Sequence, residues 1–214
     1  MKTVLQIILG IAVIFLGYMV YESVMTPIRF NNTVSEREDA AISKMIDIRE
    51  AQKAFKDAYM RYAGTYDSLE NFLRNDSILV TKATGMIPES LIDSLQDIKK
   101  AREIAMKRGI IKRESSKVAV LDSIFKHRAG FSIDSMKYVP YTNGVIFDMK
   151  AGEYVTNSGL TVKVLEVSCP YETLLNGLDE QLVVNYVDER IQITKFAGLK
   201  FGSFQEGTLS GNWE

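Results

Sequence analysis

The chain has 214 residues, of which 46% are hydrophobic and 25% are charged. These proportions are typical of folded globular chains and exclude wholesale disorder. The formal net charge of −1 argues against a nucleic-acid partner, and none is expected. One cysteine, Cys169, excludes an intramolecular disulfide, and one histidine, His127, leaves no His-rich zinc motif. We therefore expect no catalytic, cofactor-binding or metal site.

The N-terminal segment predicts a membrane anchor. Residues 3–21 form a run of nineteen residues without a charge. As a helix this run is about 28 Å long, which is enough to cross the hydrocarbon core of a bilayer. The exit after Tyr18 is too bulky for the small-residue cleavage site of a secretory signal peptide. We assign residues 1–22 to an uncleaved transmembrane signal anchor, in preference to a cleaved signal peptide or a buried core helix.

The charges beside this segment indicate its orientation. Lys2 precedes the apolar run, whereas Glu22 follows it and Arg29 comes later. This bias places the N-terminus in the cytoplasm. In a bacterial cell the chain would be a single-pass protein of the inner (cytoplasmic) membrane with a periplasmic body. There, Cys169 is expected to be buried rather than reactive.

Residues 23–64 are predicted to be a linker and an amphipathic stalk helix. Pro27 interrupts the helical pattern, and Ser35 with Glu38 matches a capping box at the start of a new helix. Apolar and aromatic residues then recur with helical spacing as far as Tyr62, and Gly64 would end the helix. The face from Ser35 to Ala63 could pack against the chain's own domain or self-associate with another copy. Intramolecular packing is slightly favoured.

Residues 65–130 are predicted to be a helical region. A short helix is expected from Ser68, and another from Pro88 to Gly109. Residues 99–117 carry eight basic and two acidic side chains. We interpret them chiefly as a solvated helix end that complements the helix dipole, with an anionic partner as the alternative.

Residues 131–214 are predicted to be β-rich. Four short runs favour strands: Met136–Val139, Val145–Met149, Thr161–Val167 and Leu182–Val187. The fold class is therefore α+β, with an N-terminal transmembrane helix, a long amphipathic helix, further helices and then a mainly antiparallel β region.

Two acidic pairs are the main candidates for chemistry. Asp179-Glu180 and Asp188-Glu189 flank the predicted strand Leu182–Val187 and could supply paired carboxylates. Charged residues are usual at the ends of an apolar strand, so a structural role is favoured. His127 is interpreted as a surface residue. No phosphate loop, nucleophile elbow or metalloprotease helix occurs in the sequence.

Residues 54–73, AFKDAYMRYAGTYDSLENFL, resemble the region of type IV pilins and type II secretion pseudopilins where the long N-terminal helix meets the globular head. The resemblance lies in Tyr59, Gly64 and Tyr66, followed by a leucine-containing segment. It implies a membrane helix that continues into an α+β head. Pilin precursors carry a glutamate in the apolar helix, whereas this span holds only Gln6 at a comparable depth.

The segment GLDEQLVVNYVDER (177–190) and the terminal GNWE are similar to uncharacterised single-pass envelope proteins of Bacteroidetes. This resemblance implies location more than activity. From the anchor, the helix behind it and the absence of catalytic motifs, we expect a non-enzymatic, membrane-anchored periplasmic scaffold subunit of a cell-envelope assembly. A pilin- or pseudopilin-like subunit and a membrane-tethered enzyme or ligand-binding protein are the alternatives.

Overall fold

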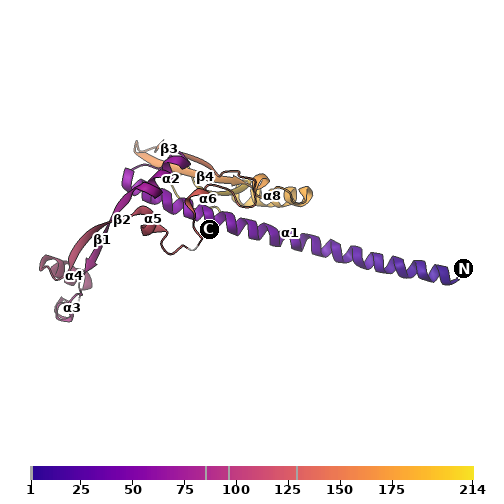
Figure 1. The fold of residues 1–214 in the computed structure, drawn as a ribbon, viewed down its shortest axis with the longest axis horizontal. Coiled ribbons are helices and arrows are strands. Elements are labelled where there is room, and N and C mark those ends of the chain that lie inside the picture. The colour runs from indigo at the N-terminus through magenta and orange to yellow at the C-terminus, as the bar shows by residue number, and fades with distance from the viewer. Residues whose placement is uncertain (1, 85, 96, 129) are drawn as a thin grey trace. The chain divides into compact units, whose positions relative to one another are not determined.

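The computed structural model describes residues 2–84, 86–95, 97–128 and 130–214. It confirms an α+β chain, with one long N-terminal helix, further helices and two antiparallel sheets. The chain divides into two compact units (Figure 1). Unit 1 comprises Met1–Tyr66 and Ser132–Glu214, and unit 2 comprises Asp67–Phe131.

Helix α1, Lys2–Tyr59, is continuous over 58 residues and contains Pro27. The predicted break at Pro27 and the predicted helix start at Ser35 are therefore wrong. Proline removes one backbone donor, and here it lies on a solvent-exposed stretch where water can satisfy the carbonyl that loses its partner. The helix also ends before Gly64, because Met60 adopts a left-handed φ of 57°.

The second half of α1 buries one face within unit 1. Apart from the adjacent pair Ala51 and Gln52, its buried residues follow steps of three, four or seven, as one face of a helix requires. They are Phe30, Val34, Ala41, Met45, Ile48, Ala51, Gln52 and Phe55. The expectation that the face from Ser35 packs inside its own domain is confirmed by this burial, although Tyr59 is 48% exposed.

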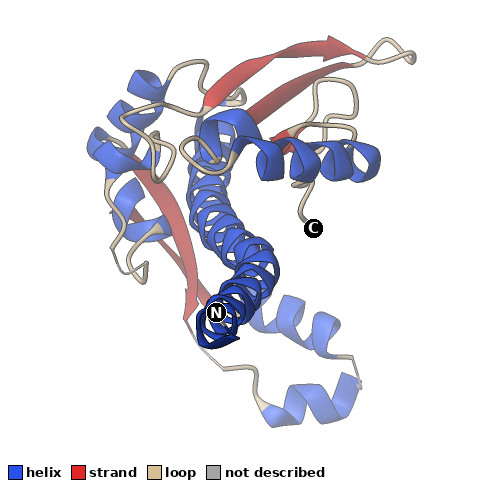
Figure 2. Ribbon diagram, turned by 90° about the vertical axis from the view of Figure 1, so that its right-hand side faces the viewer, coloured by secondary structure: helices blue, strands red, loops and turns tan. Residues whose placement is uncertain are grey.

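The sheet of unit 1 has the order β3-β4-β5, and both pairings are antiparallel. Its strands are β3 (Asp148–Val155), β4 (Thr161–Pro170) and β5 (Gly198–Gly202) (Figure 2). The strand predicted at Thr161–Val167 is confirmed within β4. Leu165, Val167 and Phe201 are fully buried and belong to the core.

Three helices complete unit 1: α6 (Ile133–Met136), α7 (Tyr171–Leu174) and α8 (Glu180–Thr194). The strand predicted at Leu182–Val187 is wrong, because these residues lie inside α8. Asp179 caps α8, and its carboxylate accepts a hydrogen bond from the Leu182 amide at 3.0 Å. The apolar run had favoured a strand, but it is too short to separate a strand from part of a helix.

The strands predicted at Met136–Val139 and Val145–Met149 are largely replaced by a small hairpin. Met136 ends α6, Tyr138 pairs with Ile146 through a single bridge, and β3 starts at Asp148. The hairpin buries Val139 and Phe147 and leaves Tyr138 and Ile146 partly exposed. The first prediction is therefore wrong apart from the bridge at Tyr138, whereas the end of the second is confirmed, because Asp148 and Met149 begin β3 and pair with β4.

Unit 2 is a two-stranded antiparallel ribbon with helices at both ends (Figure 2). The ribbon pairs β1 (Ser77–Thr84) with β2 (Lys112–Ala119), and the chain between them forms α3 (Glu89–Leu95) and α4 (Ile98–Lys107). Helices α2 (Tyr66–Asn75) and α5 (Val120–Ile124) adjoin the outer ends of the ribbon. The helical region predicted for residues 65–130 does contain helices, but the prediction lacked the two-stranded ribbon. The short helix expected from Ser68 is confirmed in α2, and the helix expected from Pro88 to Gly109 is divided into α3 and α4.

Candidate functional site

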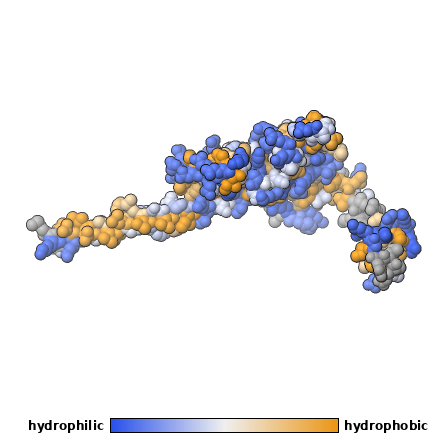
Figure 3. Space-filling model, turned by 180° about the vertical axis from the view of Figure 1, so that it is seen from behind, coloured by the Kyte–Doolittle hydropathy of each residue, from blue (hydrophilic) through white to orange (hydrophobic). Residues whose placement is uncertain are grey.

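The first half of α1 carries an apolar surface that no other part of unit 1 covers. We call residues 3–21 the apolar span. All of its side chains are exposed, and Ile14 reaches 75%. The described residues contain one helix, α1, that is long enough and apolar enough to cross a membrane. In Figure 3 this part of the helix is mostly orange, the colour of hydrophobic residues. The span is thus compatible with a single-pass anchor or a signal sequence.

A short polar stretch follows the apolar span. Arg29 contacts Glu22 at 3.4 Å, and the Thr26 hydroxyl donates to the same carboxylate at 3.4 Å. Phe30 is the first buried residue of α1. Eight residues of helix separate Glu22 from Phe30, a rise of about 12 Å. The rest of unit 1, residues 60–66 and 132–214, is hereafter the head, and its contacts with α1 begin at Phe30, nine residues beyond the end of the span.

Glu38 of α1 is the centre of a polar cluster that joins α1 to α7 and α8. The Tyr171 hydroxyl donates to Glu38 Oε1 at 2.6 Å, and the Tyr186 hydroxyl donates to the same oxygen at 2.7 Å. Arg190 lies 3.6 Å from Glu38 Oε2 and donates to the Tyr186 hydroxyl at 2.9 Å. The rings of Tyr171 and Tyr186 also contact each other edge to face, with their centroids 5.3 Å apart. Glu38 thus binds the head instead of capping a helix.

The environment of this cluster favours neutral phenols. Burial, followed by the hydrogen bond to Glu38, raises the pKa of Tyr186 to about 12. The same two causes, in the same order, raise the pKa of Tyr171 further. An ionised tyrosine would lose its donor to Glu38 and face a second negative charge. At neutral pH both hydroxyls therefore stay protonated, and their hydrogen bonds to Glu38 hold α7 and α8 against α1.

Two cations of α1 bind backbone carbonyls of the head. Arg37 donates to the carbonyl oxygens of Leu174 and Asn176 at 2.9 and 3.0 Å. Lys44 donates to those of Ser135 and Tyr138 at 2.7 and 2.9 Å. Burial lowers the pKa of Lys44, and the charge of Asp47 opposes that shift. These contacts hold the segment after α7 and the end of α6 against the helix.

Gln52 and Arg49 fasten the last turns of α1. The fully buried Gln52 amide accepts from the Ala63 N–H at 2.9 Å and donates to the Ala63 carbonyl at 3.0 Å. Arg49 contacts the Glu214 carboxylate at 2.5 Å, which ties the C-terminal segment to α1. That hydrogen bond is the first cause of a lowered Glu214 pKa. The helix and the C-terminus are therefore parts of one packed body.

The acidic pairs predicted as candidates for chemistry both lie on or beside α8. Asp179 is occupied as the helix cap, and Glu180, Asp188 and Glu189 are exposed on the helix surface. They do not flank a strand, so the predicted setting is wrong. Across the described part of the chain, no group of three His, Cys, Asp or Glu side chains could hold a metal ion.

The basic stretch 99–117 spans α4, the following turn and β2. Asp97 caps α4, and its carboxylate accepts from the amides of Lys99 and Lys100. Lys107 and Arg108 are exposed at the C-terminal end of the same helix, where cations complement the dipole. This arrangement favours the interpretation as a solvated helix end.

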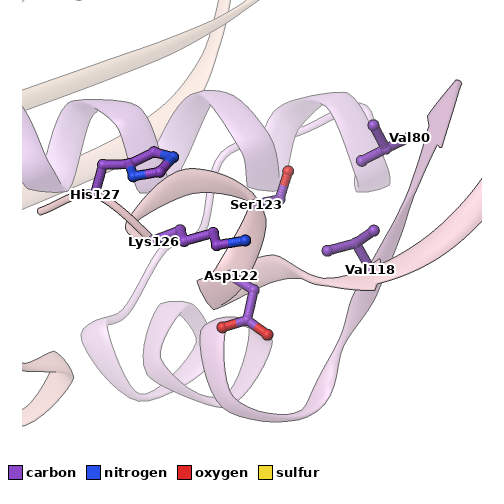
Figure 4. Close-up of a pocket in the computed structure, with 6 residues that line it drawn as sticks. All are labelled: Val80, Val118, Asp122, Ser123, Lys126 and His127. Atoms are coloured by element: carbon purple, nitrogen blue, oxygen red, sulfur yellow. The ribbon is translucent and has the colours of Figure 1, made fainter. Parts of the chain in front are cut away.

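His127 is exposed, as expected, and lines an open pocket of unit 2 (Figure 4). The pocket has a volume of about 530 Å³ and is also lined by Ser123, Lys126 and Asp122. The imidazole of His127 and the Asp122 carboxylate do not point toward one another. The residue types of a nucleophile, a base and an acid are present here, but not in the geometry of a triad.

Cys169 is buried in β4, as predicted, and burial raises the pKa of its thiol to about 12. A thiol in such surroundings stays protonated and unreactive at neutral pH. The polar cluster around Glu38 was missed at the sequence level, because Glu38 is more than 130 positions away from the other three residues of the cluster. The available signal was one tyrosine, Tyr186, close to the charged residues 188–190.

No protein-family model, no curated protein and no solved structure matches this chain. Its class is therefore described by the structure alone. It is an α+β protein built on one long N-terminal helix, whose first part is exposed and apolar and whose second part is packed into a head with an antiparallel sheet.

Proposed function

We propose that this protein is a non-enzymatic, membrane-anchored scaffold subunit of a cell-envelope assembly, with its apolar span in the inner membrane and its head in the periplasm. The observation that carries the proposal is the continuity of α1 from the exposed apolar span into the head. A tether that only retained a domain at a membrane could be flexible. A continuous helix instead fixes the height of the head above the bilayer.

The fastenings of the head to α1 support this mechanical role. Arg37, Glu38 and Lys44 each bind two groups of the head, and Gln52 binds both backbone groups of Ala63. These contacts are distributed along the length of the packed half of α1. A force applied to the head would therefore be shared between several contacts along the helix.

The prediction that copies self-associate through the stretch Ser35–Ala63 has to be revised. The apolar face of that stretch is occupied by the head, so it is not free for a second copy. Contacts between copies would use the apolar span within the bilayer or the exposed surface of the head. The lipid bilayer remains the first expected partner, and protein partners of the envelope assembly the second.

Crosslinking in intact cells, followed by purification of the full chain, tests the scaffold proposal. We expect discrete crosslinked species that contain this chain and other envelope proteins or further copies. A strictly monomeric chain without crosslinked partners would contradict it.

A reporter fused after Glu214 tests the orientation, because alkaline phosphatase is active only in the periplasm. Activity only of a cytoplasmic reporter would overturn the proposed location.

A pilin- or pseudopilin-like subunit is the second candidate. It is favoured by the way in which the second half of α1 packs into a head that contains a three-stranded antiparallel sheet, the architecture that the resemblance of residues 54–73 implies. N-terminal sequencing of the protein from membranes distinguishes the two candidates. A trimmed and N-methylated terminus would favour the pilin-like subunit, whereas an intact Met1 would exclude it.

A further inference from the structure

A shallow pocket in unit 1 lies between two loops of the head. One loop is residues 141–145, at the tip of the small hairpin, and the other is residues 172–177, from α7 to the approach of α8. The pocket has a volume of about 480 Å³ and is open to solvent. The lining residues that matter here are Tyr141, Thr142, Asn143, Glu172, Thr173 and Asn176.

Tyr141 has a left-handed backbone conformation in the turn that follows Pro140. Its φ is 59°, in the left-handed region that is uncommon for bulky residues. The two other non-glycine residues with positive φ among those described, Met60 and Lys195, both follow the C-terminus of a helix. Tyr141 instead lies in a turn. Proline at the second position of a turn and a positive φ at the third are features of a type II turn, which here fixes the direction of the Tyr141 backbone.

The Tyr141 side chain is held in place although it is 56% exposed. Its hydroxyl donates to Glu36 at 2.9 Å, and the Arg37 guanidinium lies 5.6 Å from the ring centroid. An exposed aromatic ring fixed at its hydroxyl and at one face loses little conformational entropy when a ligand stacks on it. The ring is thus preorganised for contact.

Both walls of the pocket are fixed to α1 by adjacent residues. Glu36 binds the Tyr141 loop, and Arg37 binds the carbonyls of Leu174 and Asn176 in the opposite loop. The Thr142 hydroxyl donates to the Val139 carbonyl at 2.7 Å, which stiffens the first loop. The separation of the two loops is therefore set by one turn of a packed helix.

The lining chemistry selects the ligand. Neutral hydroxyl and amide groups predominate, one carboxylate is present, and the described lining contains no Lys, Arg or His. Phosphates and other anions need cationic or amide-nest partners, so they fit poorly. Neutral groups beside a fixed aromatic ring fit a ligand with many hydroxyl groups and an apolar C–H face.

We propose that this pocket is a saccharide-binding site that takes a short segment of a glycan chain, with Tyr141 as the stacking platform and Glu172, Asn143 and Asn176 as hydrogen-bonding partners of the sugar hydroxyls. This proposal goes beyond the scaffold role. It does not depend on that role, because it rests on the residues that line one pocket of unit 1. A periplasmic head with such a site would connect a membrane subunit to a polysaccharide.

Titration calorimetry on the full chain in nanodiscs tests this site with two probes. Chitotetraose carries N-acetyl groups, and maltotetraose carries only hydroxyls. We expect a Kd of about 1 mM for at least one of them, the affinity typical of a shallow, open pocket. Binding of chitotetraose alone would assign the site to N-acetylated sugars, and binding of both would assign it to sugar hydroxyls in general.

Tyr141→Ala should weaken binding at least about tenfold, because it removes the stacking ring. Tyr138→Ala is the matched control: it removes a partly exposed tyrosine of the same hairpin that does not line the pocket, and it should bind normally. Asn143→Ala, which leaves Tyr141 in place, should also weaken binding, so the test does not depend on one variant's stability. Absence of binding for both probes, an equal loss in Tyr138→Ala, or binding only of a peptide library would overturn the proposal.

Discussion

The two halves of α1 share one helical backbone but have opposite surroundings. Residues 2–29 expose nearly every side chain, whereas the half from Phe30 onward buries a single face within the head. The apolar span in the first half is apolar all round, which suits a lipid solvent, and the second half is amphipathic, which suits packing on one side. One continuous helix can therefore suit two different surroundings, since each half is stabilised by different contacts.

The largest effect is expected from charges in the apolar span. Ile11→Lys combined with Phe15→Lys should release the chain from membranes, because each lysine near the centre of a span costs about 2.5–3.5 kcal/mol. The measurement is the fraction of chain that sediments with membranes after an alkaline wash. Asn31→Lys with Asn32→Lys is the control, since both residues are exposed on the same helix beyond the span. Retention of the Ile11/Phe15 variant in the membrane would show that the first half is no anchor.

The second half should respond in the opposite way. Ile48 is fully buried, and Ile48→Ala should lower the free energy of unfolding of the head by about 2–5 kcal/mol through lost burial and a cavity. Membrane association should not change. Denaturant unfolding followed by the fluorescence of Trp213, whose ring contacts Phe201, measures the loss. Asp57→Ala, at an exposed site of the same helix, should stay within about 0.5 kcal/mol. Equal effects of both variants would contradict a packed face.

The cluster around Glu38 should make the head sensitive to alkaline pH. The folded pKa of Tyr186 is raised to about 12 from an ordinary value of 10.0. The stability from the neutral phenol is therefore complete below the ordinary pKa and is lost as pH rises through the folded pKa. Ultraviolet absorbance of tyrosinate, recorded together with circular dichroism, follows both events.

Glu38→Gln sharpens this test. Without the carboxylate, Arg190 favours the tyrosinate unopposed, so ionisation of Tyr186 should begin at lower pH. Glu153→Gln, which replaces an exposed carboxylate on β3, should leave the titration unchanged. A titration unaffected by Glu38→Gln would mean that burial alone sets the tyrosine pKa.

The smallest effect is expected at Pro27, between the two halves. Pro27→Ala restores a helical hydrogen bond but touches neither the span nor the packed face. Membrane association and the unfolding free energy of the head should therefore stay within about 0.5 kcal/mol of the parent. The distance distribution between spin labels at Tyr18→Cys and Asp39→Cys should narrow, because the helix bends less. A broader distribution would indicate that Pro27 stabilises the continuous helix.

Periodicity predicted some elements correctly and failed where tertiary contacts decided. The recurrence from Ala41 to Phe55 identified the buried face of α1, and the alternation around Val164 identified β4. Pro27 was a misleading signal, because the helix continues on both sides of it. The run Leu182–Val187 was also ambiguous, since Asp179 as a cap and the contacts of Tyr186 with Glu38 select a helix. The ribbon β1–β2 was missed because its partners are separated by two helices.

The apolar span, the α+β class and the burial of Cys169 could be predicted from the sequence, because each follows from local composition and from the cost of exposing apolar surface to water. Only the tertiary structure decided that α1 is unbroken, that Glu38 binds two tyrosines and that Tyr141 lies beside a polar pocket. Those features depend on side chains far apart in the chain, and their hydrogen bonds form only when the packed head brings them within 3 Å of one another.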